Sequence, residues 1–272
     1  MKIGLSSCSK PFCEELFRDY AKAGISAMEI SYDLEQTNQL DFALAKKYAD
    51  KFGVELWSLH LPFMPFSVID ISRPDLADFS LEYYSKLLLK ANSEAGITRF
   101  VVHPSGEPIS DEDRKTRLET SKKYLIKLAE IAKSVDSVIL VENLPRTCLG
   151  RNSDEIVYLT ECHKSLKVVF DTNHLLCEKI SDFISKVGGR IASTHISDYD
   201  FIDEKHWLPG EGMINWNELY ADLNASGYDG VWLYEVGFDI PKSLPSRSRK
   251  LCCEDFRNNA EEIFAGREIA VI

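Results

Sequence analysis

Short apolar segments alternate with longer amphipathic segments along nearly the whole chain. The apolar segments are typical of buried strands, and the amphipathic segments carry apolar residues three and four positions apart, as helices do. Eight such pairs follow one another, and several amphipathic segments end at a glycine, where helices often stop. The expected strands are 2–7, 27–32, 55–61, 99–104, 137–144, 166–174, 191–198 and 230–237, and the expected helices are 13–24, 41–53, 76–96, 111–135, 153–163, 180–189, 215–227 and 252–264.

Strands that regularly alternate with helices predict an α/β fold with a parallel sheet. Eight repeats favour a closed (β/α)8 TIM barrel, and a chain of this length forms such a barrel as a single domain over residues 1–272. A doubly wound open sheet is the alternative, but no Gly-x-Gly-x-x-Gly sequence follows the first expected strand.

Polar side chains stand near the ends of the third to the eighth expected strand. In a TIM barrel the catalytic groups lie at the carboxyl ends of the strands, so these side chains should meet at one rim. Within a strand, residues two positions apart share a face, so each polar residue within a strand points to the same side as the residue two positions before it. The set consists of His60, His103, Glu142, Asp171 with His174 shortly after it, His195 and Glu235.

These polar residues suggest a metal site. Each alone is explained by an ordinary structural contact, but several buried acids and imidazoles at one rim are costly unless they are paired. A divalent cation satisfies them together, and carboxylate oxygens with imidazole nitrogens suit Mn, Co, Zn or Mg. Glu29 in the second strand points into the barrel or forms an ion pair or a backbone contact; the sequence leaves these alternatives open.

The sequence HWLPGEGMINW, residues 206–216, follows the seventh strand and contains a tight turn. We expect the turn to bring His206 back over the rim, with Gly210 and Gly212 allowing the sharp return. Glu211 is expected to face solvent or to brace the loop.

The formal net charge is −11, which disfavours a nucleic acid as the main partner. No apolar segment is long enough for a membrane span, so we expect no membrane association. Seven cysteines without a Cys-x-x-Cys spacing favour a reduced, cytoplasmic protein. A small-molecule carbohydrate is the expected partner, and a homo-oligomer is compatible with the sequence.

The motifs VEN, FDTNH, HISD and HWLPGEG resemble those of the xylose isomerase-like TIM-barrel superfamily, and the resemblance covers nearly the whole chain. That superfamily includes sugar and sugar-phosphate isomerases and epimerases, and the apurinic endonucleases. In the ketose 3-epimerase branch one metal is held by residues that match Glu142, Asp171, His195 and Glu235, and the residue that matches His174 contacts substrate. That branch also carries an arginine where this chain has Phe201.

The endonuclease branch implies up to three zinc ions. Its additional ligands match His60, His103, His174, Glu204 and His206, although that branch has aspartate at the place of Glu204. Many sugar isomerase-like proteins of unknown substrate carry the same turn, usually with aspartate where this chain has Asn215.

The resemblance favours a metal-dependent isomerase or epimerase that works through an enediolate. Glu142 and Glu235 would remove and return the proton, since two carboxylates with different pKa values suit that exchange. His174 and His206 would orient hydroxyl groups, and Trp57, with Phe63 and Trp207, would wall the sugar. A multi-zinc phosphodiesterase and a non-catalytic sugar-binding protein remain as alternatives.

Overall fold

Eight parallel strands form one sheet in a computed structural model that describes residues 1–7, 10–270 and 272. The strands lie in the order β7-β6-β5-β4-β3-β2-β1-β8. The strands are β1 Lys2–Ser6, β2 Ala27–Ile30, β3 Glu55–His60, β4 Arg99–Val102, β5 Val138–Glu142, β6 Leu166–Asp171, β7 Ile191–His195 and β8 Val231–Tyr234. The helices are α1 Glu14–Ala23, α2 Leu34–Gln39, α3 Phe42–Phe52, α4 Ala77–Ala95, α5 Asp111–Lys133, α6 Ser153–Thr160, α7 Ile180–Val187, the 3-10 turn η1 Gly188–Arg190, α8 Trp216–Ala225 and α9 Cys253–Phe264.

The two ends of the sheet meet at β7 and β8. Ile196, directly after β7, pairs with Tyr234 in a parallel bridge, and its amide donates to the carbonyl of Leu233 at 2.7 Å. The amide of Glu235 donates to the carbonyl of Ile196 at 3.2 Å. The sheet therefore curls into a nearly closed barrel, and the predicted (β/α)8 fold is confirmed.

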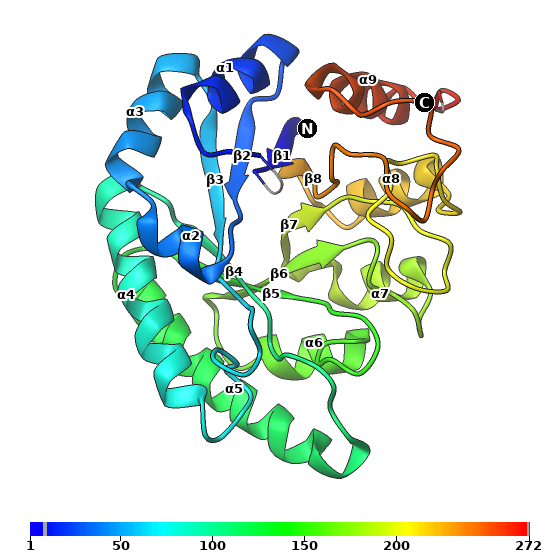
Figure 1. Ribbon diagram of the computed structural model, residues 1–272. Helices are drawn as coiled ribbons and strands as arrows, with labels where there is room; N and C mark the ends of the chain where they lie inside the picture. The colour runs from blue at the N-terminus through cyan, green and yellow to red at the C-terminus, as the bar shows by residue number, and fades with distance from the viewer. Residues whose placement is uncertain (8–9, 271) are drawn as a thin grey trace.

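The helices surround the strands, and α1 lies between α3 and α9 (Figure 1). Each predicted strand–helix pair is present. The sequence prediction missed α2, a short helix whose start is fixed by a capping box: Asp33 accepts from the amide of Gln36, and the Gln36 side chain accepts from the amide of Asp33.

Side chains also fill the inside of the barrel. One small interior cluster joins Ala27, Trp57, Val231 and Leu233, and another joins Val101, Leu140 and Val169. Gly4 belongs to the same layer, because a Cβ atom there would lie 2.5 Å from Cγ1 of Val231. The interior is thus a packed core, and the carboxyl ends of the strands are left to form a site.

Two irregularities in strand register adjust which side chains are neighbours near these ends. Between β6 and β7 the register shifts at Val168 and Val169, so that Asp171 pairs with His195. Between β2 and β3 it shifts at Met28 and Glu29. Bulges of this kind re-aim side chains and are frequent next to active sites.

None of the helices in the described part of the chain has the length and apolar character that crossing a bilayer would require. The described cysteines form no disulfide, and Cys8 lies outside the described residues.

Candidate active site

The predicted polar residues meet at the carboxyl end of the barrel, where they form three adjoining sets of possible metal ligands. Within each set one ligand atom from every residue lies within 4.8 Å of the others. The inner group consists of Glu142, Asp171, His195 and Glu235; the side group of His60, His103 and Glu142; and the outer group of His174, Glu204 and His206.

The inner group is gathered around Nδ1 of His195. This atom lies 3.0 Å from Oε1 of Glu142, 3.2 Å from Oε2 of Glu235 and 3.8 Å from Oδ2 of Asp171. Each of the side chains of Glu142, Asp171 and His195 is at most 1% exposed, and that of Glu235 is 17% exposed. Four strands therefore deliver one imidazole and three carboxylates to a nearly dry site.

Glu142 also belongs to the side group. Its Oε2 atom lies 3.2 Å from Nε2 of His60 and 3.1 Å from Nε2 of His103. In the outer group, Nε2 of His174 lies 3.6 Å from Oε2 of Glu204. Glu142 thus connects the inner group and the side group. The outer group lies nearer to solvent, as the 31% exposure of Glu204 shows.

Three of the histidines are held in the same way. In each, Nδ1 contacts a backbone carbonyl, so that Nδ1 carries the proton and the Nε2 lone pair is left for a cation. The pairs are His60 with Leu61 at 2.9 Å, His174 with Asn143 at 2.9 Å, and His206 with Glu235 at 3.2 Å.

The carboxylates of the inner group have displaced pKa values. Burial raises the pKa of Asp171 well above its ordinary value, and the charges of Glu235 and Glu142 act in the same direction. Burial also opposes ionisation of Glu142, but the neighbouring His195 and His103 hold its pKa well below the usual range. The pKa of Glu235 is lowered too, mainly by His195 against the effect of burial.

One carboxylate oxygen of the inner group makes no hydrogen bond within the described part of the chain. Oδ2 of Asp171 is buried and makes no hydrogen bond to any described residue, whereas its Oδ1 accepts from the amide of Asn173 at 2.6 Å. A buried carboxylate oxygen without a hydrogen bond is costly. A divalent cation would bind this oxygen, so the residues of the inner group fit such an ion.

A pocket of about 340 Å³ opens onto these groups. Phe63, one of the expected wall residues, lines it and stacks on His103 with 4.0 Å between ring centroids. The residues that line the pocket are Phe63, Met64, Phe66, His103, Glu107, Glu142, Leu144, Pro145, Arg146, Cys148, His174, Glu204, His206 and Glu235.

The expectation that Trp57 walls the substrate is wrong. Trp57 lies inside the barrel, where its Nε1 donates to Oγ of Ser193 at 3.0 Å and its ring packs under the guanidinium of Arg99. It is the extra residue at the irregularity between β2 and β3, which explains why simple alternation misplaces it. Trp207 is also outside the pocket lining: it is buried, and its Nε1 donates to Ser243.

Sequence reasoning missed Arg146, which ties three loops of the rim together. Its guanidinium contacts Glu107 of the β4–α5 loop, and Asp203 and Glu204 of the β7–α8 loop, the last at 3.2 Å. Its backbone adopts a φ of 52°, which is costly for a residue with a side chain. In the sequence, the one indication that Arg146 lies near the site is its position shortly after Glu142.

Asp198 was also missed, although it lies in the HISD motif. Its Oδ1 accepts from the amides of Tyr199 and Ile214, and its Oδ2 from the amide of Gly210 and Nε1 of Trp216. This one carboxylate organises the turn of residues 206–216. Because His206 begins that turn, Asp198 also fixes where His206 stands.

Glu211 braces the loop and does not face solvent. Its side chain is 2% exposed, accepts from the amide of Leu208 at 2.8 Å, and pairs with Arg247, whose Nε lies 2.8 Å from Oε1. One of the two alternatives from the sequence is thereby confirmed, and solvent exposure of Glu211 is excluded.

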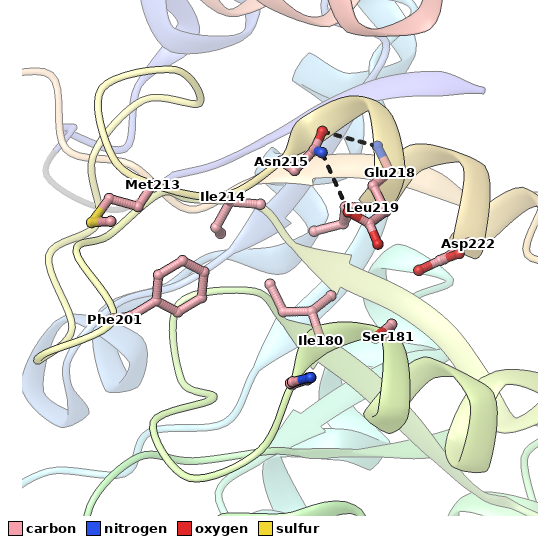
Figure 2. Close-up of a pocket in the computed structure, with 10 residues that line it drawn as sticks. Ile180, Ser181, Phe201, Met213, Ile214, Asn215, Glu218, Leu219 and Asp222 are labelled. Carbon is pink, nitrogen blue, oxygen red and sulfur yellow. Dashed lines mark hydrogen bonds between the residues drawn. The ribbon is translucent and has the colours of Figure 1, made fainter.

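Phe201 stands away from the metal-ligand groups. It lines a separate groove on the outside of the barrel, together with Ile180, Met213 and Leu219 (Figure 2). The groove contains none of the predicted site residues. The position that carries an arginine in ketose 3-epimerases therefore lines an outer groove here, among both apolar and polar residues.

A family model described as "Xylose isomerase-like TIM barrel" matches residues 17–250. An uncharacterized protein of Methanocaldococcus jannaschii is 30% identical over 140 residues, which span 48% of this chain and 48% of that protein. Fructoselysine 3-epimerase of Escherichia coli O157:H7 is 30% identical over 63 residues, or 23% of each chain. The chain thus spans about half, or less, of the length of these two relatives.

Among solved structures, the fold is similar to that of D-psicose 3-epimerase crystallised in the presence of D-fructose. The TM-score is 0.78, the identity 18%, and the likeness covers 98% of either chain. The match of the family model to most of the sequence, together with the barrel and its rim, shows that this chain belongs to the xylose isomerase-like TIM barrel family.

Proposed function

We propose that the inner group holds a divalent metal ion and that the chain is a sugar isomerase or epimerase. The observation that carries the proposal is the inner group itself: three carboxylates and one imidazole meet in a buried site, with one carboxylate oxygen that makes no hydrogen bond to a described residue. The names of two similar proteins, a fructoselysine 3-epimerase and a D-psicose 3-epimerase, support this class of reaction.

A bound divalent ion would supply Lewis acidity, which polarises the sugar carbonyl and stabilises the enediolate formed on deprotonation beside it. Glu142 and Glu235 both line the pocket and have ligand oxygens within 4.8 Å of one another. One carboxylate removes the proton from the carbon and the other returns it. If the proton returns to the same carbon from the opposite face, the product is an epimer; if it returns to the neighbouring carbon, the product is an isomer.

The rest of the pocket orients the sugar. His174 and His206 have Nε2 directed away from their backbone partners, so they can bind hydroxyl groups or a second ion. Phe63 and Phe66 form an apolar wall against which the carbon face of a sugar can pack.

The charge of the lining favours an unphosphorylated sugar. Among the described residues that line the pocket, Arg146 is the one lysine or arginine, and Glu107, Asp203 and Glu204 already pair with it. A phosphate group would therefore meet four glutamates and no uncommitted cationic side chain. We infer that neutral sugars are better substrates than their phosphates.

Replacement of Glu142 tests this proposal. Glu142→Gln keeps the shape of the side chain but removes its charge and its capacity to accept a proton. We expect turnover of ketohexoses to fall by at least about 10³-fold while the fold survives, because proton transfer and ion binding are both impaired.

Glu218→Gln is the matched control, since Glu218 lines the distant groove and lies outside the ligand groups. Turnover should be unchanged in this variant. Sugar turnover that persists in Glu142→Gln would reject the proton-transfer role of Glu142.

A multi-metal phosphodiesterase is the second candidate, and one observation favours it: the side and outer groups are assembled beside the inner group. Fully loaded, the rim would hold three ions. Against this stand the net charge of −11 and the contact between Arg146 and Glu204, which occupies a ligand of the outer group.

Metal content per chain distinguishes the two functions. Elemental analysis of protein purified without chelator should give one ion per chain for the isomerase, and three for the phosphodiesterase. Nicking of a duplex that contains an abasic site would support the second candidate, whereas sugar turnover without nicking would reject it.

A further inference from the structure

We propose that Glu29 is a positioning residue that holds His195 and thereby sets the affinity of the inner group for its metal ion. This inference rests on the proposed function, because it concerns the same metal site. Glu29 stands in β2, outside the three ligand groups, and no part of its side chain is exposed.

The contacts of Glu29 connect it to His195 on one side and to the barrel wall on the other. Its Oε1 lies 2.9 Å from Nε2 of His195, and its Oε2 accepts from Oγ of Ser58 at 2.6 Å. Neither Oε1 of Glu29 nor Nε2 of His195 makes a hydrogen bond to any described residue. Their 2.9 Å separation is a close polar contact between two buried atoms, without the alignment of a hydrogen bond.

Two register shifts bring these side chains together. The shift between β2 and β3 pairs Glu29 with Ser58, where an uninterrupted register would pair it with Trp57. The shift between β6 and β7 pairs His195 with Asp171, where an uninterrupted register would pair Asp171 with Thr194. Both register shifts therefore contribute to one series of contacts, which runs from Ser58 through Glu29 to His195 and the inner group.

His195 is held differently from the other histidines of the rim. His60, His174 and His206 each have Nδ1 at a neutral backbone carbonyl and Nε2 toward the rim. In His195 the ring is reversed: Nδ1 makes its hydrogen bond to a side chain, at Oε1 of Glu142, and Nε2 faces Oε1 of Glu29.

This difference has a chemical consequence. With a metal ion bound at Nδ1, the neutral imidazole of His195 carries its one proton on Nε2, next to Glu29. A carboxylate behind an imidazole also makes its other nitrogen a stronger ligand, and loss of such a partner typically weakens metal binding by about 10–100-fold. Glu29 therefore strengthens metal binding by the inner group.

Glu29→Gln tests the role of the carboxylate. The amide has nearly the same shape and can still accept from Ser58, but its NH2 group then faces Nε2 of His195 and favours the tautomer with the proton on Nδ1. That proton blocks the metal-binding nitrogen. Titration of metal-stripped protein with Zn²⁺ in competition with a chromophoric chelator should show an affinity about 10–100-fold below that of the unmutated chain.

Asp255→Asn is the matched control, because Asp255 is also a buried carboxylate, 8% exposed, but pairs with Arg249 at the start of α9. Its Zn²⁺ affinity should equal that of the unmutated chain. Equal affinity in Glu29→Gln would overturn the role of Glu29 and leave the proposed metal site standing. If the unmutated chain binds no divalent ion, the proposed function fails, and the role of Glu29 fails with it.

A second measurement needs no variant at this position, so it does not depend on the folding of Glu29→Gln. Long-range ¹H–¹⁵N spectra of the zinc-loaded, ¹⁵N-histidine-labelled protein report which ring nitrogen carries the proton and which binds the metal. We expect one histidine with metal on Nδ1 and the proton on Nε2, and this signal should vanish in His195→Gln. Absence of a histidine of this type would contradict the proposal.

Discussion

At the scale of single residues, the surroundings of each histidine determine how readily its second ring nitrogen binds a proton or a metal ion. His174 is 6% exposed, and burial lowers its pKa to about 4 in the absence of a metal ion. His174 therefore binds a proton more readily in the unfolded chain than in the folded protein. The free energy of unfolding falls as the pH drops below about 6.5, the ordinary pKa of histidine.

This gives a prediction for the metal-stripped protein. Between pH 6.5 and pH 5, the contribution of His174 should lower the free energy of unfolding by about 2 kcal/mol, because 1 pKa unit corresponds to about 1.4 kcal/mol. Urea unfolding at the two pH values measures the loss. His174→Asn should reduce it by about this amount. An equal acid loss in the variant and the unmutated chain would refute the role of His174.

Trp57 offers a second prediction at this scale. Trp57→Phe removes the hydrogen bond to Ser193 and part of a buried ring, so the free energy of unfolding should fall by about 1–3 kcal/mol. KM for the sugar should stay the same, since Trp57 lies outside the pocket. A rise in KM without loss of stability would contradict this and would indicate that Trp57 contacts the substrate.

The sequence predicts the strand-end residues well, because strand alternation and the barrel topology together determine where such side chains point. All the expected metal ligands do lie at one rim. Trp57 was misplaced because a register shift cannot be read from a single sequence. Arg146 and Asp198 were missed because their partners are far away along the chain, in other loops.

At the scale of elements, the β7–α8 loop is a rigid part of the site. Asp198 accepts four hydrogen bonds within it, and the backbone approaches this side chain closely at Gly212. A Cβ atom at Gly212 would lie 2.3 Å from Oδ1 of Asp198 and 2.4 Å from the carbonyl oxygen of Tyr199. Only glycine fits there.

Gly212→Ala should therefore disturb the loop. We expect a loss of about 2–4 kcal/mol in the free energy of unfolding and a displacement of His206. Gly189→Ala is the control, since a Cβ atom at Gly189 meets nothing within 4 Å. Chemical denaturation of both variants measures the difference. Equal stability in the two would show that the loop adapts and does not fix His206.

The succession of strands and helices was predicted with few omissions, because period and length distinguish the two kinds of segment. The missing elements are short. Helix α2 has 6 residues and depends on a local capping box, and the register shifts have no pattern of their own.

At the scale of the whole molecule, the ligand groups tie distant parts of the barrel together. The inner group alone joins β5, β6 and β7 to the end of β8, the strand that closes the sheet against β7. A cation bound there stabilises the folded state by mass action, since an unfolded chain cannot present these ligands together.

Metal removal should therefore lower the stability of the entire barrel. At a free ion concentration of about 100 times Kd, the gain is about 2.7 kcal/mol. Thermal unfolding with and without EDTA measures it for the unmutated chain. Glu235→Gln should show a much smaller shift, because it weakens the inner group. A shift of the same size in both proteins would place the stabilising ion elsewhere.

The central claim is that the inner group holds a divalent ion at the carboxyl end of this barrel. Anomalous scattering from crystals grown with Mn²⁺, collected near the manganese absorption edge, tests it most directly. We predict a strong anomalous peak bounded by Glu142, Asp171, His195 and Glu235. A map without a peak among these four residues, from crystals of a sugar-converting preparation, would contradict the account.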